Sequence, residues 1–567
     1  MISININGKD IEIEEKSSIL EAAQKTGYII PTLCFMKMSD NETYNCKGSC
    51  RVCVVEVEGY KDLQPACYTE AKEGMRILTN STKAREGRKT IIELLLSNHP
   101  NDCLNCSKNM NCELQSLARD YGVSNINAKI ENPTEIDGST PIIKTMDKCI
   151  LCRRCVTACA EIQNMNILTP TNRSYNTHIT TFNDKPLIEV DCTYCGQCVA
   201  VCPTGALTER MDYPKLFKML EDKNKFVVVQ MAPSVRVALC EEFGVGPEVL
   251  TTNKIVSALK LLNFNKVFDT NFSADLTIME ETKELIERIK NKENLPLFTS
   301  CCPAWVKMVE SKYPEYTSLL STCKSPQEMF GAIAKEYLPE LFQIKKEDLV
   351  VASIMPCIAK KDEAARSEME NEVDIVITSR ELAKMIREAG IDIVNMKEED
   401  FDNPFGGSSG AGMIFGASGG VMEAALRTAY EIITTETLED INFKEARGIK
   451  GIKEAVVKIK DQELKIVVAS SLKNGQKIME EVIKDRDKYD FIEIMACPGG
   501  CINGGGQPYI KSNIGKIEKR MDRVYLEDEN KTIRKSHENP QILKLYDELL
   551  NNSNTDLCHK LLHRSYR

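Results

Sequence analysis

Cysteines are the residues of this chain best suited to chemistry, and they occur in groups. Of the 24 cysteines, sixteen lie between Cys34 and Cys202. The later ones include three sites far apart in the chain: Cys301-Cys302, Cys357, and Cys497 with Cys501. No export signal precedes them, and clustered thiols in a reducing compartment usually hold metal rather than form disulfides. The pattern predicts a series of iron–sulfur sites that lead to one further site, built by distant segments.

The first 80 residues predict a small β-rich domain. Alternating isoleucines flank Asn7-Gly8, which is typical of a hairpin turn. Ser18 and Glu21 form a capping box that starts a helix, and Gly27 ends it. A strand is expected at 54–59, directly after Cys53.

Four cysteines of this domain suit a 2Fe–2S cluster of the plant-ferredoxin type. We expect the ligands to be Cys34, Cys50, Cys53 and Cys67. Cys46 is a fifth candidate for four positions. We favour Cys50 because the Cys50-x2-Cys53 pair leads regularly into the strand, and we interpret Cys46 as a spare thiol.

A histidine introduces the next group, after an apolar helix expected at 91–96. The group consists of His99, Cys103, Cys106 and Cys112. A lone histidine is usually structural, but this one stands four residues before three closely spaced cysteines. We interpret His99 as the fourth ligand of a 4Fe–4S cluster. Neutral imidazole in place of a thiolate reduces the negative charge on a cluster and raises its potential in Rieske centres, so we expect the same direction here.

Two further runs follow the pattern of bacterial two-cluster ferredoxins, in which the fourth cysteine of each run ligates the other cluster. The first cluster would take Cys149, Cys152, Cys155 and Cys202, and the second Cys192, Cys195, Cys198 and Cys159. A zinc ribbon is the alternative, but zinc sites rarely use two runs of four cysteines. Such clusters transfer single electrons to a site elsewhere in the chain.

The length and net charge of the chain limit its possible domain organisation and binding partners. The chain has 567 residues and a net charge of −10, which argues for several domains and against broad nucleic-acid binding. We expect no membrane span, no signal peptide and a cytoplasmic location. The domains are expected at 1–80, 81–125, 126–210 and 211–567, and the last ends in a helical wrap from about 511 to 567. The fold class is multidomain α+β, with ferredoxin-like domains before an α/β catalytic domain.

The α/β part carries its cysteines at the ends of apolar strands. Strands are expected at 295–298, 349–354 and 491–494, and each runs into a loop that contains cysteine. A fourth, at 226–229, runs into the segment 231–234. Open α/β sheets bind ligands beyond the carboxyl ends of their strands, so these loops can converge on one metal site.

These three cysteine loops closely resemble the motifs of iron-only (FeFe) hydrogenases, and the upstream groups match the large clostridial form along nearly the whole chain. The resemblance implies that a 4Fe–4S cluster is held by Cys302, Cys357, Cys497 and Cys501. It implies that Cys501 also bridges to a diiron unit with CO, cyanide and azadithiolate ligands. Lys360 would hydrogen-bond a cyanide, which would supply the anion that a buried lysine needs. The unit would be lined by Ala232, Pro233, Ser234, Ser325, Pro326, Gln327, Met355 and Met495.

The resemblance also implies a proton route that begins at Cys301, which is not needed as a cluster ligand. A thiol, with a pKa of about 8.5, can transfer a proton near neutrality. The route would continue through Glu281, Ser321 and Glu284, with Arg288 nearby. Glu281 and Glu284 are three residues apart on an expected helix, and therefore on one face.

The activity expected is that of a ferredoxin hydrogenase, in which two protons and two electrons form H2 reversibly. The expected partners are ferredoxin or a similar one-electron carrier and maturation proteins for the diiron unit, and the chain is expected to be a monomer. A basic run could help to dock an acidic ferredoxin: Lys83, Arg85, Arg88 and Lys89. The alternatives are an iron–sulfur assembly protein, an electron-transfer subunit and a hydrogen sensor.

Overall fold

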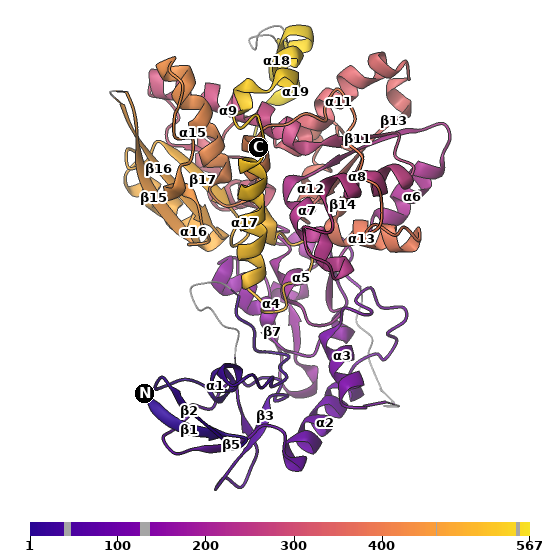
Figure 1. Cartoon of the computed structure of the whole chain (residues 1–567), viewed down its shortest axis with the longest axis vertical. Helices are drawn as coiled ribbons and strands as arrows, with labels where there is room; N and C mark the ends of the chain where they lie inside the picture. The colour runs from indigo at the N-terminus through magenta and orange to yellow at the C-terminus, as the bar shows by residue number, and fades with distance from the viewer. Residues whose placement is uncertain (39–46, 125–135, 461, 551–555, 567) are drawn as a thin grey trace. The chain divides into compact units, whose positions relative to one another are not determined.

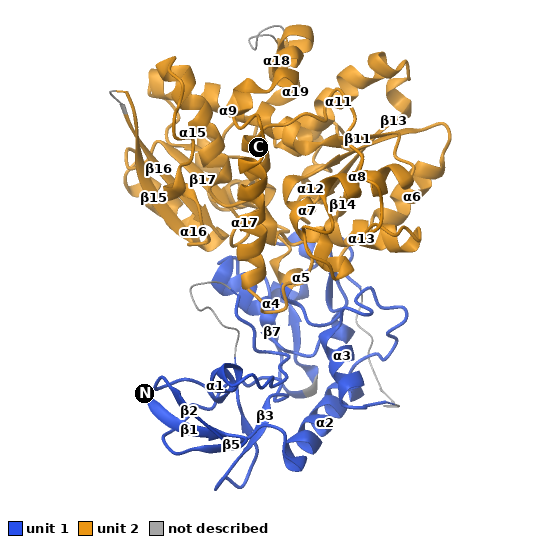
Figure 2. Ribbon diagram, viewed as in Figure 1, with its two compact units in different colours: residues 1–190, 201–208 blue, residues 191–200, 209–567 orange. Residues whose placement is uncertain are grey.

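The computed structural model describes residues 1–38, 47–124, 136–460, 462–550 and 556–566. They form two compact units (Figure 2). Unit 1 comprises residues 1–190 and 201–208, and unit 2 comprises residues 191–200 and 209–567. Cys46 lies outside the described residues. Among the described helices, none is both long and apolar enough to cross a bilayer.

Unit 1 begins with the predicted hairpin. Strands β1 (Ile2–Ile6) and β2 (Lys9–Ile13) pair antiparallel around Asn7-Gly8. With β3 (Val54–Val57), β4 (Gln64–Pro65) and β5 (Arg76–Leu78) they form a five-stranded sheet in the order β2-β1-β5-β3-β4. The capping box of Ser18 and Glu21 starts helix α1 (Ile19–Lys25), as predicted. The hairpin, cap and strand expectations are therefore confirmed.

Helix α2 (Thr82–Ser97) corrects the interpretation of the basic run. It begins nine residues before the predicted apolar segment at 91–96, and its arginine at position 88 is buried. Arg88 donates hydrogen bonds to the Val54 and Thr79 carbonyls, at 2.9 and 2.8 Å. It therefore connects α2 to the sheet, and only Lys83, Arg85 and Lys89 of that run are exposed.

Unit 2 contains two four-stranded sheets, on opposite sides of the unit in Figure 1. The first has the order β11-β10-β13-β14, all parallel: β11 (Lys266–Asp269), β10 (Phe226–Met231), β13 (Leu349–Met355) and β14 (Ile375–Thr378). The second has the order β12-β17-β16-β15: β12 (Leu297–Phe298), β17 (Phe491–Met495), β16 (Gln462–Ser470) and β15 (Ile452–Ile459). Only β15 runs antiparallel to its neighbour.

The four predicted strands of this part are present, but they are divided between the two sheets. The loops that follow β10 and β13 belong to one sheet, and those that follow β12 and β17 belong to the other. All four strands are almost wholly buried, as apolar runs in parallel sheets usually are. The carboxyl ends of both sheets thus supply the site.

Long helices complete unit 2. Helix α9 (Thr270–Asn291) follows β11 and contacts α11 (Pro326–Phe342) and α15 (Gly420–Thr434). The C-terminal segment forms α17 (Gly515–Glu529), α18 (Pro540–Leu545) and α19 (Asp556–Leu562). Helix α17 contacts α7 (Pro233–Ala238), α18 contacts α9, and α19 contacts α11, so this segment runs over much of the unit.

Replacing Arg88 by methionine is expected to loosen the contact between α2 and the sheet. The substitution keeps most of the apolar stem but leaves two carbonyls without their donor, which costs about 2 kcal/mol. If the helix opens locally, backbone amides of β3 and β5 exchange with solvent roughly 30-fold faster. Hydrogen exchange read by mass spectrometry measures this change. The exposed neighbour is the control: Lys89→Met should leave exchange unaltered, and equal rates in both variants would contradict the assigned role.

Candidate active site

The carboxyl ends of the two sheets of unit 2 enclose a cavity of ≈ 80 Å³. Six of the residues predicted to act at one centre line it: Cys301, Cys302, Cys357, Lys360, Cys497 and Cys501. They come from the loops after β12, β13 and β17, which are nearly 200 residues apart in the chain. The structure therefore brings together the six residues that the sequence argument had assigned to one centre.

The other residues expected around this centre also line the cavity, with one exception. Those present are Ala232, Pro233, Ser234, Pro326, Gln327, Met355 and Met495. Ser325 is not in the wall, because its Oγ donates to Glu363 Oε2 at 3.0 Å. The sequence argument missed several wall residues: Thr270, Ala274, Phe415 and Gly416. They have no chemical signature in the sequence and are placed only by the folding of α9 and the 415–416 turn.

Burial makes the four candidate cluster thiols difficult to ionise. It raises the pKa of Cys302, Cys357, Cys497 and Cys501, and for Cys357 to about 12. Repulsion between neighbouring thiolates raises the pKa of Cys357, Cys497 and Cys501 further. Metal ligation requires the thiolate form, so a positively charged metal core would supply the countercharge that this site needs. Four thiols that converge on one cavity therefore fit an iron–sulfur cluster.

Lys360 has an anionic partner within the protein itself. Its Nζ donates to Glu363 Oε2 at 2.6 Å and to the Cys301 carbonyl at 3.1 Å. Burial opposes the charge on Lys360, but Glu363 outweighs it and the pKa of Lys360 is raised. Glu363 is therefore an anionic partner in addition to the cyanide that the resemblance implies, and the contact with cyanide stays a prediction. Glu363 stands three residues after Lys360 on one helical turn, a spacing that could have revealed it.

The residues of the predicted proton route form a connected row. Glu281 is buried on α9, and Ser321 contacts its carboxyl group. The Ser321 hydroxyl donates to Glu284 Oε2 at 2.9 Å, and Arg288 donates to Glu284 Oε1 at 2.5 Å. Burial and then the charge of Glu284 raise the pKa of Glu281 to about 8. A carboxyl group with this pKa can both hold and release a proton near neutrality.

Cys301 occupies the inner end of this row. Burial raises its pKa well above that of an ordinary thiol, and the carboxylate of Glu281 raises it further. Cys323 does not line the cavity; its Sγ instead points to Glu284 Oε2 at 3.8 Å. The structure thus places Cys323 beside the outer part of the row.

A segment of the second ferredoxin-like run reaches the same cavity within unit 2. Cys195 lines the wall, and Gln197 Nε2 donates to Cys497 Sγ and to the Asn503 carbonyl, both at 3.2 Å. Gly505 permits this approach, because a Cβ there would lie 2.7 Å from the Gly196 Cα. The segment that carries the predicted accessory ligands Cys195 and Cys198 is therefore in contact with Cys497, a predicted ligand of the central cluster.

The four thiols expected for a 2Fe–2S cluster lie together in unit 1. Cys34 contacts both Cys50 and Cys67, and Cys53 contacts Cys67. The contact with Cys34 raises the pKa of the Cys50 and Cys67 thiols. All four are buried. This arrangement supports the assignment of Cys50, which remains a prediction.

His99 is buried in unit 1, and neither ring nitrogen has a hydrogen-bond partner of normal geometry among the described residues. Burial lowers the pKa of His99 and outweighs the opposite effect of the Pro100 carbonyl. A neutral imidazole with orphaned nitrogens fits a metal ligand. Cys103 and Cys112 each interact electrostatically with Cys106, so the three cysteines of this group lie close together.

The first ferredoxin-type ligand set also converges. Cys149, Cys152, Cys155 and Cys202 line one small pocket of unit 1. Burial raises the pKa of Cys149 to about 12. The other set combines Cys159 of unit 1 with three cysteines of unit 2, Cys192, Cys195 and Cys198, and it stays a prediction.

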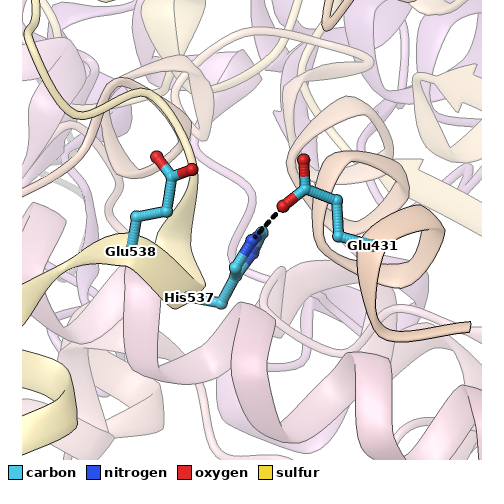
Figure 3. Close-up of side chains that lie close together, drawn as sticks. All are labelled: Glu431, His537 and Glu538. Atoms are coloured by element: carbon cyan, nitrogen blue, oxygen red, sulfur yellow. Dashed lines mark hydrogen bonds and ion pairs between the residues drawn. The ribbon is translucent and has the colours of Figure 1, made fainter. Parts of the chain in front are cut away.

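A further group of possible metal ligands lies away from the cavity: Glu431, His537 and Glu538 (Figure 3). His537 Nε2 is 2.8 Å from Glu431 Oε2. The ammonium of Lys535 already contacts both carboxylates, Glu431 at 2.5 Å and Glu538 at 3.3 Å. We therefore interpret this group as an ion-pair network that fastens the C-terminal segment to α15.

Comparison with known families assigns a description to each part of the chain. The model for the C-terminal domain of the iron-only hydrogenase large subunit matches residues 225–505, and that for the iron hydrogenase small subunit matches 514–567. Upstream, a 2Fe-2S iron-sulfur cluster binding domain matches 1–82. The iron-sulfur binding region of NADH-ubiquinone oxidoreductase-G matches 88–127, and the ferredoxin-like domain of NADH-quinone oxidoreductase subunit 3 matches 140–208.

Similar proteins span the whole chain. The NADP-reducing hydrogenase subunit HndD of Solidesulfovibrio fructosivorans is 46% identical over 100% of this chain and 99% of its own length. Iron hydrogenase 1 of Clostridium pasteurianum is 39% identical over 100% of both chains. The structure of an apo [FeFe]-hydrogenase from Chlamydomonas reinhardtii matches with a TM-score of 0.57 at 40% identity, and it covers 63% of this chain and 99% of that one.

Replacement of His99 tests whether this residue is a cluster ligand. His99→Ala should lose about four iron atoms per chain, whereas His99→Cys should retain them and shift the cluster to a lower potential, because a thiolate adds negative charge. Iron analysis and redox-titrated electron paramagnetic resonance measure both effects. His178, which contacts Asp184 near the surface, provides the control substitution His178→Ala. Full iron content in His99→Ala would refute the assignment.

Proposed function

Because the chain belongs to the family of iron-only (FeFe) hydrogenases, we propose that it catalyses the reversible formation of H2 from two protons and two electrons as a ferredoxin hydrogenase. The observation that carries this proposal is the convergence of four thiols, Cys301 and Lys360 in one buried cavity. An electron-transfer subunit needs no such cavity, and an iron–sulfur assembly protein needs no thiol and carboxyl row beside it.

The residues of the cavity fit the cofactor of this family. Cys302, Cys357, Cys497 and Cys501 would hold the 4Fe–4S cluster, and Cys501 would also bridge to the diiron unit. Lys360 would present its ammonium group toward a cyanide, while Glu363 holds the lysine in place. When bound, the diiron unit with its CO, cyanide and azadithiolate ligands supplies the polarisation of H–H and the base that accepts the proton. The cavity is lined mostly by apolar atoms, which excludes water from this chemistry.

The proton route follows from the row of residues on α9 and the 321–323 loop. Cys301 is placed to exchange a proton between the cavity and Glu281. Glu281 can pass it to Ser321, whose hydroxyl both donates and accepts. Ser321 already donates to Glu284, which lies at the edge of the buried region with Arg288 beside it. Each residue in the row thus has a definite neighbour on either side.

Electrons would arrive through the accessory clusters: one 2Fe–2S cluster and three 4Fe–4S clusters. The contact of Gln197 with Cys497 supports entry into the central cluster from the second ferredoxin-type set. Ferredoxin is the proposed carrier, since iron–sulfur clusters exchange single electrons. A relative is a subunit of an NADP-reducing hydrogenase, so a larger assembly is the second candidate context. We also propose the cytoplasmic location, a monomeric chain and a need for maturation proteins.

Infrared spectroscopy of anaerobically matured protein tests the reaction centre. Bands of CO and cyanide ligands should appear, and Cys301→Ala should keep these bands while H2 turnover falls by a factor of about 10² or more, because a proton-transfer group is lost. The matched control is Cys240→Ala, because Cys240 is buried but does not line the cavity. Absence of the bands after maturation contradicts the hydrogenase proposal, and near-normal turnover of Cys301→Ala contradicts the proton route alone.

The electron donor is tested with the purified full-length chain. Reduced ferredoxin should support H2 production, and NADPH alone should support less than about 1% of that rate, because hydride transfer needs an acceptor such as a flavin. Gas chromatography of H2 measures both rates at equal donor potential. Production from NADPH by the isolated chain would replace ferredoxin as the proposed partner.

A further inference from the structure

The end of the chain pairs with the loop that carries Ser321. The Lys324 amide donates to the Leu562 carbonyl, and the Arg564 amide donates to the Thr322 carbonyl, both at 2.8 Å. These bonds form an antiparallel bridge between Cys323 and His563. The side chains continue the contact, since Thr322 Oγ1 lies 2.8 Å from His563 Nδ1. The last residues therefore act as a short added strand beside the proton route.

Tyr566 makes the innermost contact of this strand. Its hydroxyl donates to the Ser321 carbonyl and also contacts the side chain of Ser300. Ser300 precedes Cys301 and donates from its Oγ to the Cys323 carbonyl at 2.8 Å. One hydroxyl group thus joins the loop of Cys301 to the loop of Ser321.

The Ser321 loop depends on such contacts because it lies outside regular secondary structure. On one side the Ser321 amide donates to the Phe298 carbonyl at 2.7 Å. On the other side its carbonyl accepts from Tyr566. The hydroxyl of Ser321 must serve Glu281 and Glu284 at the same time, and proton transfer requires heavy atoms about 2.6–3.2 Å apart. A small shift of this backbone would break one of the two contacts.

The strand itself is held in register by α9. Glu280, the neighbour of Glu281, accepts from Tyr546 and lies 3.2 Å from His563 Nε2. Cys558 Sγ points to the same carboxylate at 3.7 Å. Three groups of the C-terminal segment therefore meet one buried acid on the helix that also carries the proton route. Their placement links the position of Tyr566 to the position of Glu281.

We propose that Tyr566 is a positioning residue for proton transfer, and that the C-terminal segment completes the proton route rather than only covering the unit. This inference rests on the proposed hydrogenase function. Tyr566 exchanges no proton with the substrate in this scheme; it fixes the Ser321 backbone so that the serine hydroxyl bridges Glu281 and Glu284.

The test compares two tyrosine variants of the matured full-length enzyme. Tyr566→Phe removes the hydroxyl that contacts Ser321. Tyr525→Phe is the matched control, because Tyr525 also belongs to the C-terminal segment and is buried, but its hydroxyl has no partner among the described residues. H2 turnover is normalised to the intensity of the CO bands, so that incomplete loading of the diiron unit does not affect the comparison.

For Tyr566→Phe we expect unchanged CO and cyanide bands, an unchanged KM for H2, and a kcat reduced on the order of tenfold, because misplacing a reacting group by a fraction of an ångström slows transfer. The solvent deuterium isotope effect on kcat should increase, since proton transfer becomes more rate-limiting. Tyr525→Phe should match the wild type in all four measurements. Ser300→Ala, which removes the other group in contact with Tyr566, should change kcat and the isotope effect in the same direction.

Two results would overturn the inference. One is a kcat and an isotope effect in Tyr566→Phe equal to those of Tyr525→Phe. The other is a lower kcat with an unchanged isotope effect, which assigns Tyr566 to stability alone. A wild-type protein without CO bands after maturation contradicts the hydrogenase function instead, so the two failures are distinguishable.

Discussion

The pairing of buried charges around one cavity is the constraint on which unit 2 depends. A charge removed from water requires a partner close by, and the pairs Lys360–Glu363 and Arg288–Glu284 meet this need at 2.6 and 2.5 Å. In the described part of the chain Glu281 has no cation in contact, and burial and then the charge of Glu284 raise its pKa to about 8. Glu281 therefore differs from the paired acids beside it, because a carboxyl group with this pKa can hold and release a proton near neutrality.

In the proposed function, electrons and protons would approach the cavity through different contacts, and one loop would serve both. Cys302 is the expected cluster ligand and Cys301 the expected proton carrier, although they are adjacent. The loop is fixed before these residues by the Thr299 amide, which donates to the Ile492 carbonyl at 2.9 Å, and by the bond of Ser300 to Cys323. A fixed backbone allows the adjacent side chains of Cys301 and Cys302 to contact different partners. Gln197 contacts Cys497 on a different loop, so the proposed electron entry and proton transfer would use different atoms.

The sequence predicted the features that depend on local chemistry. Ligand spacing located the cysteine groups, apolar runs located β10, β13 and β17, and Ser18 with Glu21 located the start of α1. It failed where a partner is distant in the chain or has no side-chain signature. Arg88 was interpreted as exposed because its partners are backbone carbonyls, which no sequence pattern shows. Glu363, by contrast, has a signal in the sequence, because it stands three residues after Lys360. The sequence argument instead took its anionic partner for Lys360, a cyanide ligand, from the family resemblance.

The C-terminal segment illustrates why long-range polar contacts matter for function. Apolar packing alone would allow it to slide along α9 and α15 with little penalty. Buried acids prevent this, because each accepts from particular donors. Asp275 accepts from Ser536 at 2.8 Å and from Asn539 at 2.9 Å, and Arg427 donates to Asp528 at 2.9 Å. A shift by one residue would leave these acids unpaired in the interior, at a cost of several kcal/mol. The same register determines whether the chain end reaches Ser321, so the stability of this segment and the geometry of the proton route have a common origin.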